Sequence, residues 1–279
     1  MRLADFECRV PGKFVLSGEH SVLRGSGAVV LPHPEAALSL KFLPSETGEL
    51  KIDSHGGAEA IRLLIEKGRD LARALGAEVV PPSGELKLES TIPVGAGLGS
   101  SAALCVSVMK WFSQVLKLDS SQEFSFARSL ENQFHGTSSG MDVAAVLAGV
   151  PVFFQRGEWQ PVVVPTAPRF SFHDTGVRAK TSECVSRVSE FVRTYPSEAW
   201  ILDERMSEAS RRIRAGLLAS PPDLAQIALG MQTSQQCFEV WGLLPSEAQA
   251  KATELLQQGA LAVKLTGSGG GGFLVALWG

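Results

Sequence analysis

Apolar residues recur with the period of a helix over several long segments of the chain. The clearest covers residues 58–75, where apolar side chains repeat every three or four positions and Gly76 follows as a C-terminal cap. Another begins at Ser120, which fits a capping box together with Glu123, and it continues to Phe134. Further helices are predicted at 102–116, 181–192, 200–218, 222–241 and 246–258.

Shorter apolar or alternating segments predict strands. Residues 10–16 and 28–31 flank a Gly-Glu-His turn, and an extended pattern continues over 36–43. Other strands are predicted at 85–89, 159–164, 169–173, 262–266 and 273–278, so the chain should close in a β-hairpin. The fold class is therefore α+β, a mixed α/β pattern. Pro165 and Pro168 place a boundary near residue 166, which divides the chain into domains 1–166 and 167–279.

Composition and charge exclude several kinds of protein. The chain has 279 residues, 44% hydrophobic and 20% charged, which is typical of a globular protein and excludes disorder and a coiled coil. Its 26 Lys and Arg against 29 Asp and Glu give a net charge of −3, so we expect no nucleic-acid partner. Neither a bilayer-spanning stretch nor a signal peptide is visible, so we expect a soluble, cytoplasmic protein with no membrane partner. Its four widely spaced cysteines favour reduced thiols.

Glycine is in excess. The chain has 28 glycines, whereas an average usage of about 7% would give roughly 20. Three of them lie within residues 95–99 and five within 267–272, so these two clusters account for the excess.

The first cluster, Gly95-Ala96-Gly97-Leu98-Gly99-Ser100-Ser101, joins a predicted strand to a predicted helix. Glycines let a ligand approach the backbone, and the amides at a helix N-terminus attract anions, so the segment suits a phosphate. Ser100 and Ser101 either cap the helix or contact a phosphate or its metal ion. A turn that is tight only for packing is the alternative, and the absence of a following Lys excludes a Walker A loop.

The second cluster, residues 267–272, formally matches a dinucleotide-binding fingerprint. A strand follows it, however, where that fingerprint needs a helix and a later acidic residue, so we reject the dinucleotide interpretation. The loop is then either a flexible hairpin connection or a backbone that passes close to a ligand. Five glycines in six positions favour the second alternative.

Glu131 and Asp142 are two carboxylates 11 residues apart, separated by a predicted helix end and a polar turn. Phosphoryl transfer uses one carboxylate to help hold Mg²⁺ and another to accept the proton of the attacking hydroxyl. A solvated helix residue and a helix cap are the alternatives. Lys13 lies in an apolar run, so its ammonium needs a partner, which Glu19 or His20 could supply.

These residues lie in four segments that resemble, in the same order, the motifs of the GHMP kinases, and most closely those of the mevalonate kinases. The segments span nearly the whole chain: Pro11-Gly-Lys-Phe-Val-Leu-Ser-Gly-Glu-His-Ser-Val22, Pro93-Val-Gly-Ala-Gly-Leu-Gly-Ser-Ser-Ala-Ala103, Glu131 with His135-Gly136 and Ser139-Gly140-Met141-Asp142, and Lys264-Leu-Thr-Gly-Ser-Gly-Gly-Gly-Gly272.

The resemblance implies an N-terminal domain like domain 2 of ribosomal protein S5, a ferredoxin-like C-terminal domain, and ATP-dependent phosphorylation of the primary hydroxyl of mevalonate. Asp142 would be the catalytic base, Lys13 would orient the acceptor hydroxyl, and Glu131 and Ser101 would hold Mg²⁺. The ATP phosphates would be bound by Gly95, Ala96, Gly97, Leu98, Gly99, Ser100 and Ser101, with Gly269 and Gly270 in the loop that closes over them. The acceptor pocket would be lined by Glu19, His20, Ser139 and Thr181.

Three residues depart from the pattern of the family near the acceptor. Ser138 stands where Pro is usual, Met141 replaces a β-branched residue, and Ser17 replaces a commonly aromatic one. A kinase for another small hydroxy acid or a sugar, or a non-catalytic homologue that senses a ligand, is therefore the alternative to a mevalonate kinase. A small molecule is the expected partner in each case, and the resemblance suggests a homodimer.

Overall fold

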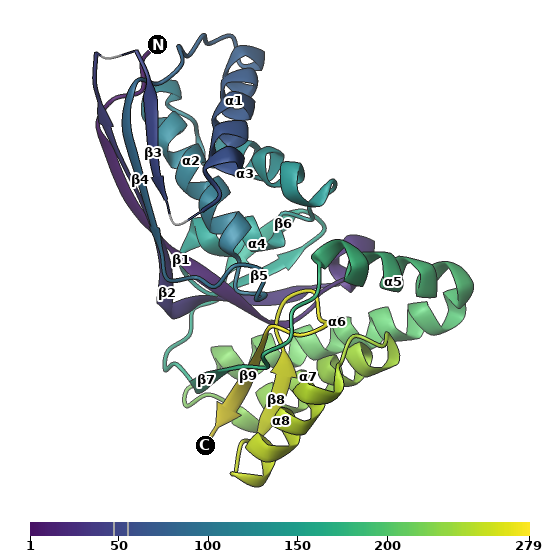
Figure 1. Cartoon of the computed structure of the whole chain (residues 1–279). Helices are drawn as coiled ribbons and strands as arrows, with labels where there is room; N and C mark the ends of the chain where they lie inside the picture. Colours follow the sequence, from purple (N-terminus) through teal and green to yellow (C-terminus); the bar gives the residue numbers. More distant parts are fainter. Residues whose placement is uncertain (47, 55) are drawn as a thin grey trace. The chain divides into compact units, whose positions relative to one another are not determined.

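The computed structural model describes residues 1–46, 48–54 and 56–279, and it confirms the mixed class, with 46% helix and 24% strand. The described residues group into two compact units (Figure 1). The first combines residues 1–12, 33–93 and 100–147, and the second combines 13–32, 94–99 and 148–279. Each unit is thus assembled from separate segments, and the division into sequence domains at residue 166 stays a prediction.

The first unit contains a sheet with helices against it. Strand β4 (Gly84–Ser90) pairs antiparallel with the second half of β2 (Ala28–Pro44) and parallel with β3 (Leu50–Ser54). Helix α1 (Ala58–Ala74) connects the two parallel strands and lies on the same side of the sheet as α2 (Ser100–Leu116) (Figure 1). Residues 10–16 and 36–43 were predicted as strands and lie in β1 (Phe6–Ser17) and β2.

A cluster of aromatic side chains lies in the core of the first unit. Trp111 and Phe112 of α2 are fully buried, and Trp111 packs on Phe42 of β2 with ring centroids 4.5 Å apart. Phe112 packs in turn on Phe126 of α3 (Ser120–His135) at 5.7 Å. Because α2 buries side chains on every face, it forms the centre of this unit and fixes the position of its own first turn.

The second unit has a three-stranded sheet in the order β7 (Arg169–Asp174), β9 (Phe273–Trp278), β8 (Ala262–Leu265). Antiparallel pairing of β8 with β9 confirms the predicted hairpin around the second glycine cluster. Helices α7 (Leu224–Val240) and α8 (Ser246–Gln257) pack on this sheet (Figure 1). The remaining elements of the unit are η1 (Ser21–Arg24), β5 (Val152–Gln155), β6 (Glu158–Pro161), α5 (Thr181–Thr194) and α6 (Pro196–Leu218).

Several predicted boundaries were wrong for identifiable reasons. The two strands predicted at 28–31 and 36–43 form the single strand β2, because Pro32 and Pro34 fall between the residues paired with β5 and those paired with β4. Proline has no backbone N–H, but at these two positions no hydrogen bond to β4 or β5 is lost. The strand predicted at 159–164 ends at Pro161, and β3 was not predicted because five alternating residues are too few to stand out.

The capping box of α3 is shifted by one residue from its predicted position. Asp119 rather than Ser120 is the N-cap: its Oδ1 accepts from the backbone N–H of Gln122 at 2.9 Å, and Oε1 of Gln122 accepts from the N–H of Asp119 at 3.0 Å. Glu123 instead accepts a hydrogen bond from Ser113 of α2. Aspartate has the same capping chemistry as serine, so the two positions could not be separated from the sequence.

We expect Asp119→Ala to lower the free energy of unfolding by about 1 kcal/mol, because it leaves the amide of Gln122 at the helix end without its acceptor. The matched variant Ser120→Ala should cost less than about 0.5 kcal/mol, since Ser120 is an exposed residue after the cap. Urea denaturation followed by circular dichroism measures both. A larger loss in Ser120→Ala would contradict the assigned cap.

Candidate functional site

Lys13 is anchored on the first glycine loop of the second unit. The side chain is 2% exposed, its backbone N–H donates to the carbonyl of Leu98 at 2.9 Å, and Nζ donates to the carbonyl of Gly97 at 3.0 Å. A Cβ at Gly99 would lie 2.6 Å from Cγ of Lys13, so glycine is needed there to let the lysine pass. The ammonium is therefore held at the loop predicted to bind phosphate, where a cation supports an anionic ligand.

The two glycine clusters pack backbone against backbone. A Cβ at Gly97 would lie 2.2 Å from the carbonyl oxygen of Thr266, and one at Gly267 would lie 2.5 Å from Cα of Gly97. A Cβ at Gly272 would lie 2.7 Å from the carbonyl oxygen of Ala96. At these three positions glycine is needed because a side chain would prevent the two loops from packing together. The sequence pattern did not predict this contact. Around Gly95 there is open space, which leaves room for a ligand.

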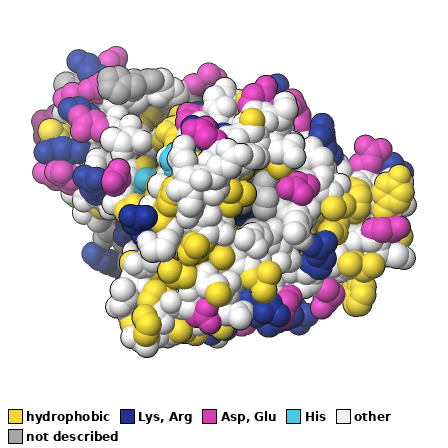
Figure 2. All heavy atoms as spheres, turned by 90° about the horizontal axis from the view of Figure 1, so that it is seen from below, with side chains coloured by type: hydrophobic (Ala, Val, Ile, Leu, Met, Phe, Trp, Pro, Cys, Tyr) yellow, Lys and Arg dark blue, Asp and Glu magenta, His cyan; other side chains and the backbone are white. Residues whose placement is uncertain are grey.

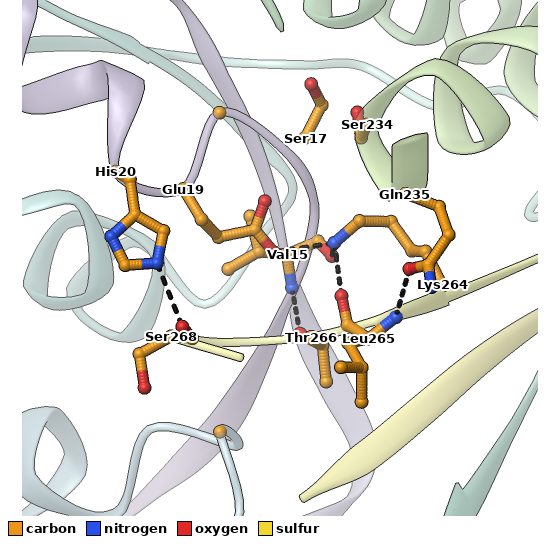
Figure 3. A network of polar contacts seen from close by, with 12 residues as sticks. Val15, Ser17, Glu19, His20, Ser234, Gln235, Lys264, Leu265, Thr266 and Ser268 are labelled. Atoms are coloured by element: carbon orange, nitrogen blue, oxygen red, sulfur yellow. Dashed lines mark hydrogen bonds and ion pairs between the residues drawn. The ribbon is translucent and has the colours of Figure 1, made fainter. Parts of the chain in front are cut away.

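Lys264 and Glu19 form a buried ion pair in the second unit (Figure 3). Nζ of Lys264 lies 2.6 Å from Oε1 of Glu19, and the two side chains are 0% and 4% exposed. The ammonium also donates to the carbonyls of Val15 and Leu265 and lies 5.1 Å from the ring centroid of Phe238. Burial raises the pKa of Glu19 and lowers the pKa of Lys264, and the attraction within the pair opposes both shifts.

His20 is held next to this pair by a positive φ and one hydrogen bond. Its φ of 61° is rare for a residue with a side chain. Nε2 lies 2.9 Å from the carbonyl oxygen of Ser268, which can only accept, so Nε2 carries the proton (Figure 3). The ring packs edge-on against Phe238 and Trp241. Burial lowers the pKa of His20 to about 4, so the imidazole is neutral near pH 7.

Thr181 joins His20 at the second glycine loop. Oγ1 of Thr181 accepts from the hydroxyl of Ser268 at 3.4 Å, while the carbonyl of the same Ser268 accepts from His20. Thr266, at the start of this loop, accepts from the backbone N–H of Val15 at 2.7 Å. The loop thus gathers two of the predicted acceptor-pocket residues of the second unit, His20 and Thr181.

The carboxylates of the first unit lie at the end of α3 and the start of α4 (Met141–Ala148). Glu131 is 2% exposed, and one of its oxygens accepts a short hydrogen bond from the hydroxyl of Ser138. Asp142 is half-buried and lies in the first turn of α4. Ser139 accepts a hydrogen bond from the N–H of Met141 at 3.2 Å.

Glu131 lies close enough to Cys105 of α2 for its charge to act on the thiol. Burial raises the pKa of the Cys105 thiol well above its usual value, and the charge of Glu131 raises it further. Ser101 precedes Cys105 by four residues, so the two side chains lie on the same face of the helix. Ser100 and Ser101, both half-buried, occupy the first two positions of α2, whose first amide N–H groups have no partner within the helix.

The donors around Glu131 fit a metal ion that arrives with a nucleotide. Over residues 1–46, 48–54 and 56–279, no group of three or more His, Cys, Asp or Glu side chains is arranged to hold a metal ion. Mg²⁺ typically binds one or two protein carboxylates and completes its shell with water and substrate phosphates. A buried carboxylate on α3 and a serine hydroxyl at the start of α2 match that requirement.

The sequence analysis did not predict the ion pair of Lys264 with Glu19 or the packing of Phe238 and Trp241 on His20. A lysine in the apolar strand β8 is the signal that could have revealed the ion pair, by the same argument that singled out Lys13. Ser17, which was expected near the acceptor, is fully buried and hydrogen-bonds with Ser210 and Met206 of α6. In the second unit the structure brings together Lys13, Glu19, His20 and Thr181 with the two glycine loops. The first unit holds Glu131, Ser138, Ser139 and Asp142.

Two family models match the chain. The model of the GHMP kinases N-terminal domain matches residues 60–150, and that of the GHMP kinases C-terminal domain matches residues 214–278. The mevalonate kinase of Aeropyrum pernix is 30% identical over 96% of this chain and 87% of its own length, and that of Archaeoglobus fulgidus is 28% identical over 96% and 90%. The chain belongs to the GHMP kinases. It is an ATP-dependent kinase with an alcohol acceptor.

Solved structures show the same fold. A crystal structure of mevalonate kinase from L. major in complex with R-mevalonate has a TM-score of 0.80 at 22% identity, covering 98% of this chain and 86% of that one. The mevalonate kinase of Methanococcus jannaschii has a TM-score of 0.81 at 15% identity, covering 99% and 91%. The two-domain GHMP kinase fold predicted from the sequence is confirmed.

We expect Lys264→Met to lower the free energy of unfolding by about 3–5 kcal/mol, because it leaves the carboxylate of Glu19 buried without its cation. The double variant Glu19→Gln with Lys264→Met should recover most of that loss. Urea unfolding of the two single variants and the double variant measures the coupling. Additive losses would contradict a direct ion pair.

We expect His20 to make the protein less stable as the pH falls from about 6.5 to about 4. The unfolded histidine, with a pKa of about 6.5, binds a proton in this window that the folded one does not. His20 lowers the free energy of unfolding by at most about 1.4 kcal/mol for each pH unit in this window, and its contribution stops changing below about pH 4. Unfolding midpoints of the wild type and His20→Gln between pH 4 and 8 test this. A difference between the two that does not vary with pH would contradict it.

Proposed function

We propose that this kinase transfers the γ-phosphoryl group of ATP to the primary hydroxyl of mevalonate. The observation that carries the proposal is the match over 96% of the chain to curated relatives named mevalonate kinase. The proposal places the activity in the cytoplasm, in keeping with four free cysteine thiols. No helix in the described ranges, which omit only residues 47 and 55, is long and apolar enough to cross a membrane.

Asp142 accepts the proton of the acceptor hydroxyl in this proposal, and Lys13 orients that hydroxyl. The carboxylate of Asp142 is held in the first turn of α4 and can accept a proton as a general base does. The ammonium of Lys13, fixed by the carbonyl of Gly97, supplies positive charge beside the loop. Both effects act by position and electrostatics, which are the main contributions that phosphoryl transfer asks of a protein.

The ATP phosphates are bound by backbone amides. Gly95 to Gly99 and the first turn of α2 offer N–H donors without a basic surface, which agrees with the net charge of −3. On the face in Figure 2, positive and negative side chains are interspersed. Glu131 and Ser101 would hold Mg²⁺, which would supply positive charge to offset the negative charge of the phosphates.

The acceptor is bound by Glu19, His20, Ser139 and Thr181. Oε2 of Glu19 is buried and has no hydrogen-bond partner among the described residues, so it is suited to accept from a hydroxyl of the substrate. Because Nε2 of His20 donates to Ser268, Nδ1 carries a lone pair and is a second acceptor. Two hydrogen-bond acceptors suit a substrate that presents hydroxyl groups. We propose a homodimer on the resemblance alone.

We expect Asp142→Asn to reduce turnover by several powers of ten, on the order of 10³, because the amide cannot accept the proton. Binding of MgATP, followed by calorimetry, should stay within about threefold. The matched variant Asp70→Asn, on the exposed ion pair with Arg73, should retain full activity. Undiminished turnover in Asp142→Asn would contradict the mechanism.

A coupled assay of ADP release over a panel of alcohols tests the acceptor. Mevalonate should give the highest kcat/KM. A sugar or another hydroxy acid that is phosphorylated better would replace the proposed substrate. Binding of ATP with no turnover on any alcohol of the panel would favour the non-catalytic alternative.

A further inference from the structure

Ser138 lies at the centre of the hydrogen bonds that hold the turn between α3 and α4. Its hydroxyl donates to Oε2 of Glu131 and accepts from the N–H of Gly140 at 2.9 Å. Its backbone N–H donates to Oδ1 of Asn132 at 2.8 Å, and its carbonyl accepts from Nε of Arg128 at 3.0 Å. Ser138 is 8% exposed; the two bonds of its hydroxyl are buried, and the two bonds of its backbone are partly buried.

The three partners on α3 form one helical face. Arg128, Glu131 and Asn132 are related by spacings of three and four residues, so their side chains lie together on the side that faces the turn. Gly140 brings the turn close to the helix: a Cβ there would lie 2.8 Å from the ring of Phe124, and its φ is +86°. The turn is thus fixed to α3 two residues before Asp142.

The bond from Ser138 determines how the carboxylate of Glu131 is rotated. A serine hydroxyl has one hydrogen, and because the N–H of Gly140 can only donate, that hydrogen goes to Glu131. Fixing Oε2 also fixes the direction of the other oxygen of the same planar group. Outer partners that orient a carboxylate ligand affect metal affinity although they do not contact the metal.

We propose that Ser138 is a positioning residue that orients Glu131 toward a divalent cation bound with the nucleotide and ties that carboxylate to the turn that carries Asp142. The inference rests on the proposed function of Glu131 as a metal ligand. Proline, usual at this position in the resembling family, has neither the hydroxyl for Glu131 nor the N–H for Asn132. In this chain a side-chain hydrogen bond therefore acts where proline would rely on a rigid backbone.

The test measures Mn²⁺ binding by electron paramagnetic resonance in the presence of ADP, which needs neither turnover nor an acceptor. We expect Ser138→Ala to weaken Mn²⁺ binding about tenfold or more. Ser138→Thr keeps the hydroxyl and should stay within about threefold of the wild type. Ser129→Ala, which removes a hydroxyl that donates within α3 to the carbonyl of Ser125, should not change Mn²⁺ binding.

Activity gives a second readout. In Ser138→Ala, the concentration of Mg²⁺ for half-maximal turnover should rise by a similar factor, and saturating Mg²⁺ should restore part of kcat. Equal Mn²⁺ affinity in Ser138→Ala and the wild type would overturn the inference, as would equal losses in the Ala and Thr variants. Urea unfolding checks that each variant folds; a lowered unfolding midpoint with unchanged Mn²⁺ affinity would show a purely structural role. If mevalonate proves not to be the acceptor, the Mn²⁺ result still decides the role of Ser138.

Discussion

The ammonium of Lys264 is the group to which the Gly-Glu-His turn and two strands of the second unit are bonded. A lysine has three N–H groups, and here all three are used: one on Glu19, one on the carbonyl of Val15 and one on the carbonyl of Leu265. A charge removed from water is tolerated only when its hydrogen bonds are satisfied in this way. Strand β1, strand β8 and the Gly-Glu-His turn are therefore all bonded to Nζ of Lys264. The positive φ of His20 is maintained by the fixed position of the neighbouring Glu19.

Much of the fold could be predicted from local patterns. Helix α1 follows its apolar period to within one residue, and the closing hairpin follows from two apolar segments around a glycine loop. Short elements were harder, because five residues such as those of β3 carry too little periodicity to stand out. Adjacent polar residues at a helix start, Asp119 and Ser120, were not distinguishable, since either side chain can accept from an amide three residues ahead.

Site residues could be predicted where a charged side chain lies in an apolar segment, where burial of its charge is unfavourable without a partner. They could not be predicted where their role depends on a contact between residues distant in sequence. Lys13 stood out as a charge in an apolar run. The hydrogen bond from Ser138 to Glu131 joins residues seven apart across a turn, so it depends on how that turn folds back on α3. The two glycine clusters were predicted to bind a ligand. Their contact with each other was not predicted, because it joins segments that are about 170 positions apart in sequence and are brought together only by the tertiary structure.

That contact between the loops affects how substitutions in them should be interpreted. Alanine at 97, 267 or 272 would push one backbone off the other before any nucleotide is present. A variant with weakened ATP binding at these three positions would therefore report damage to the shape of the loops as much as the loss of a phosphate contact. Gly95 has a φ of +68° but open space around it, so a side chain there would strain the backbone without colliding with another residue, and the proposed phosphate contact is tested more directly at this position.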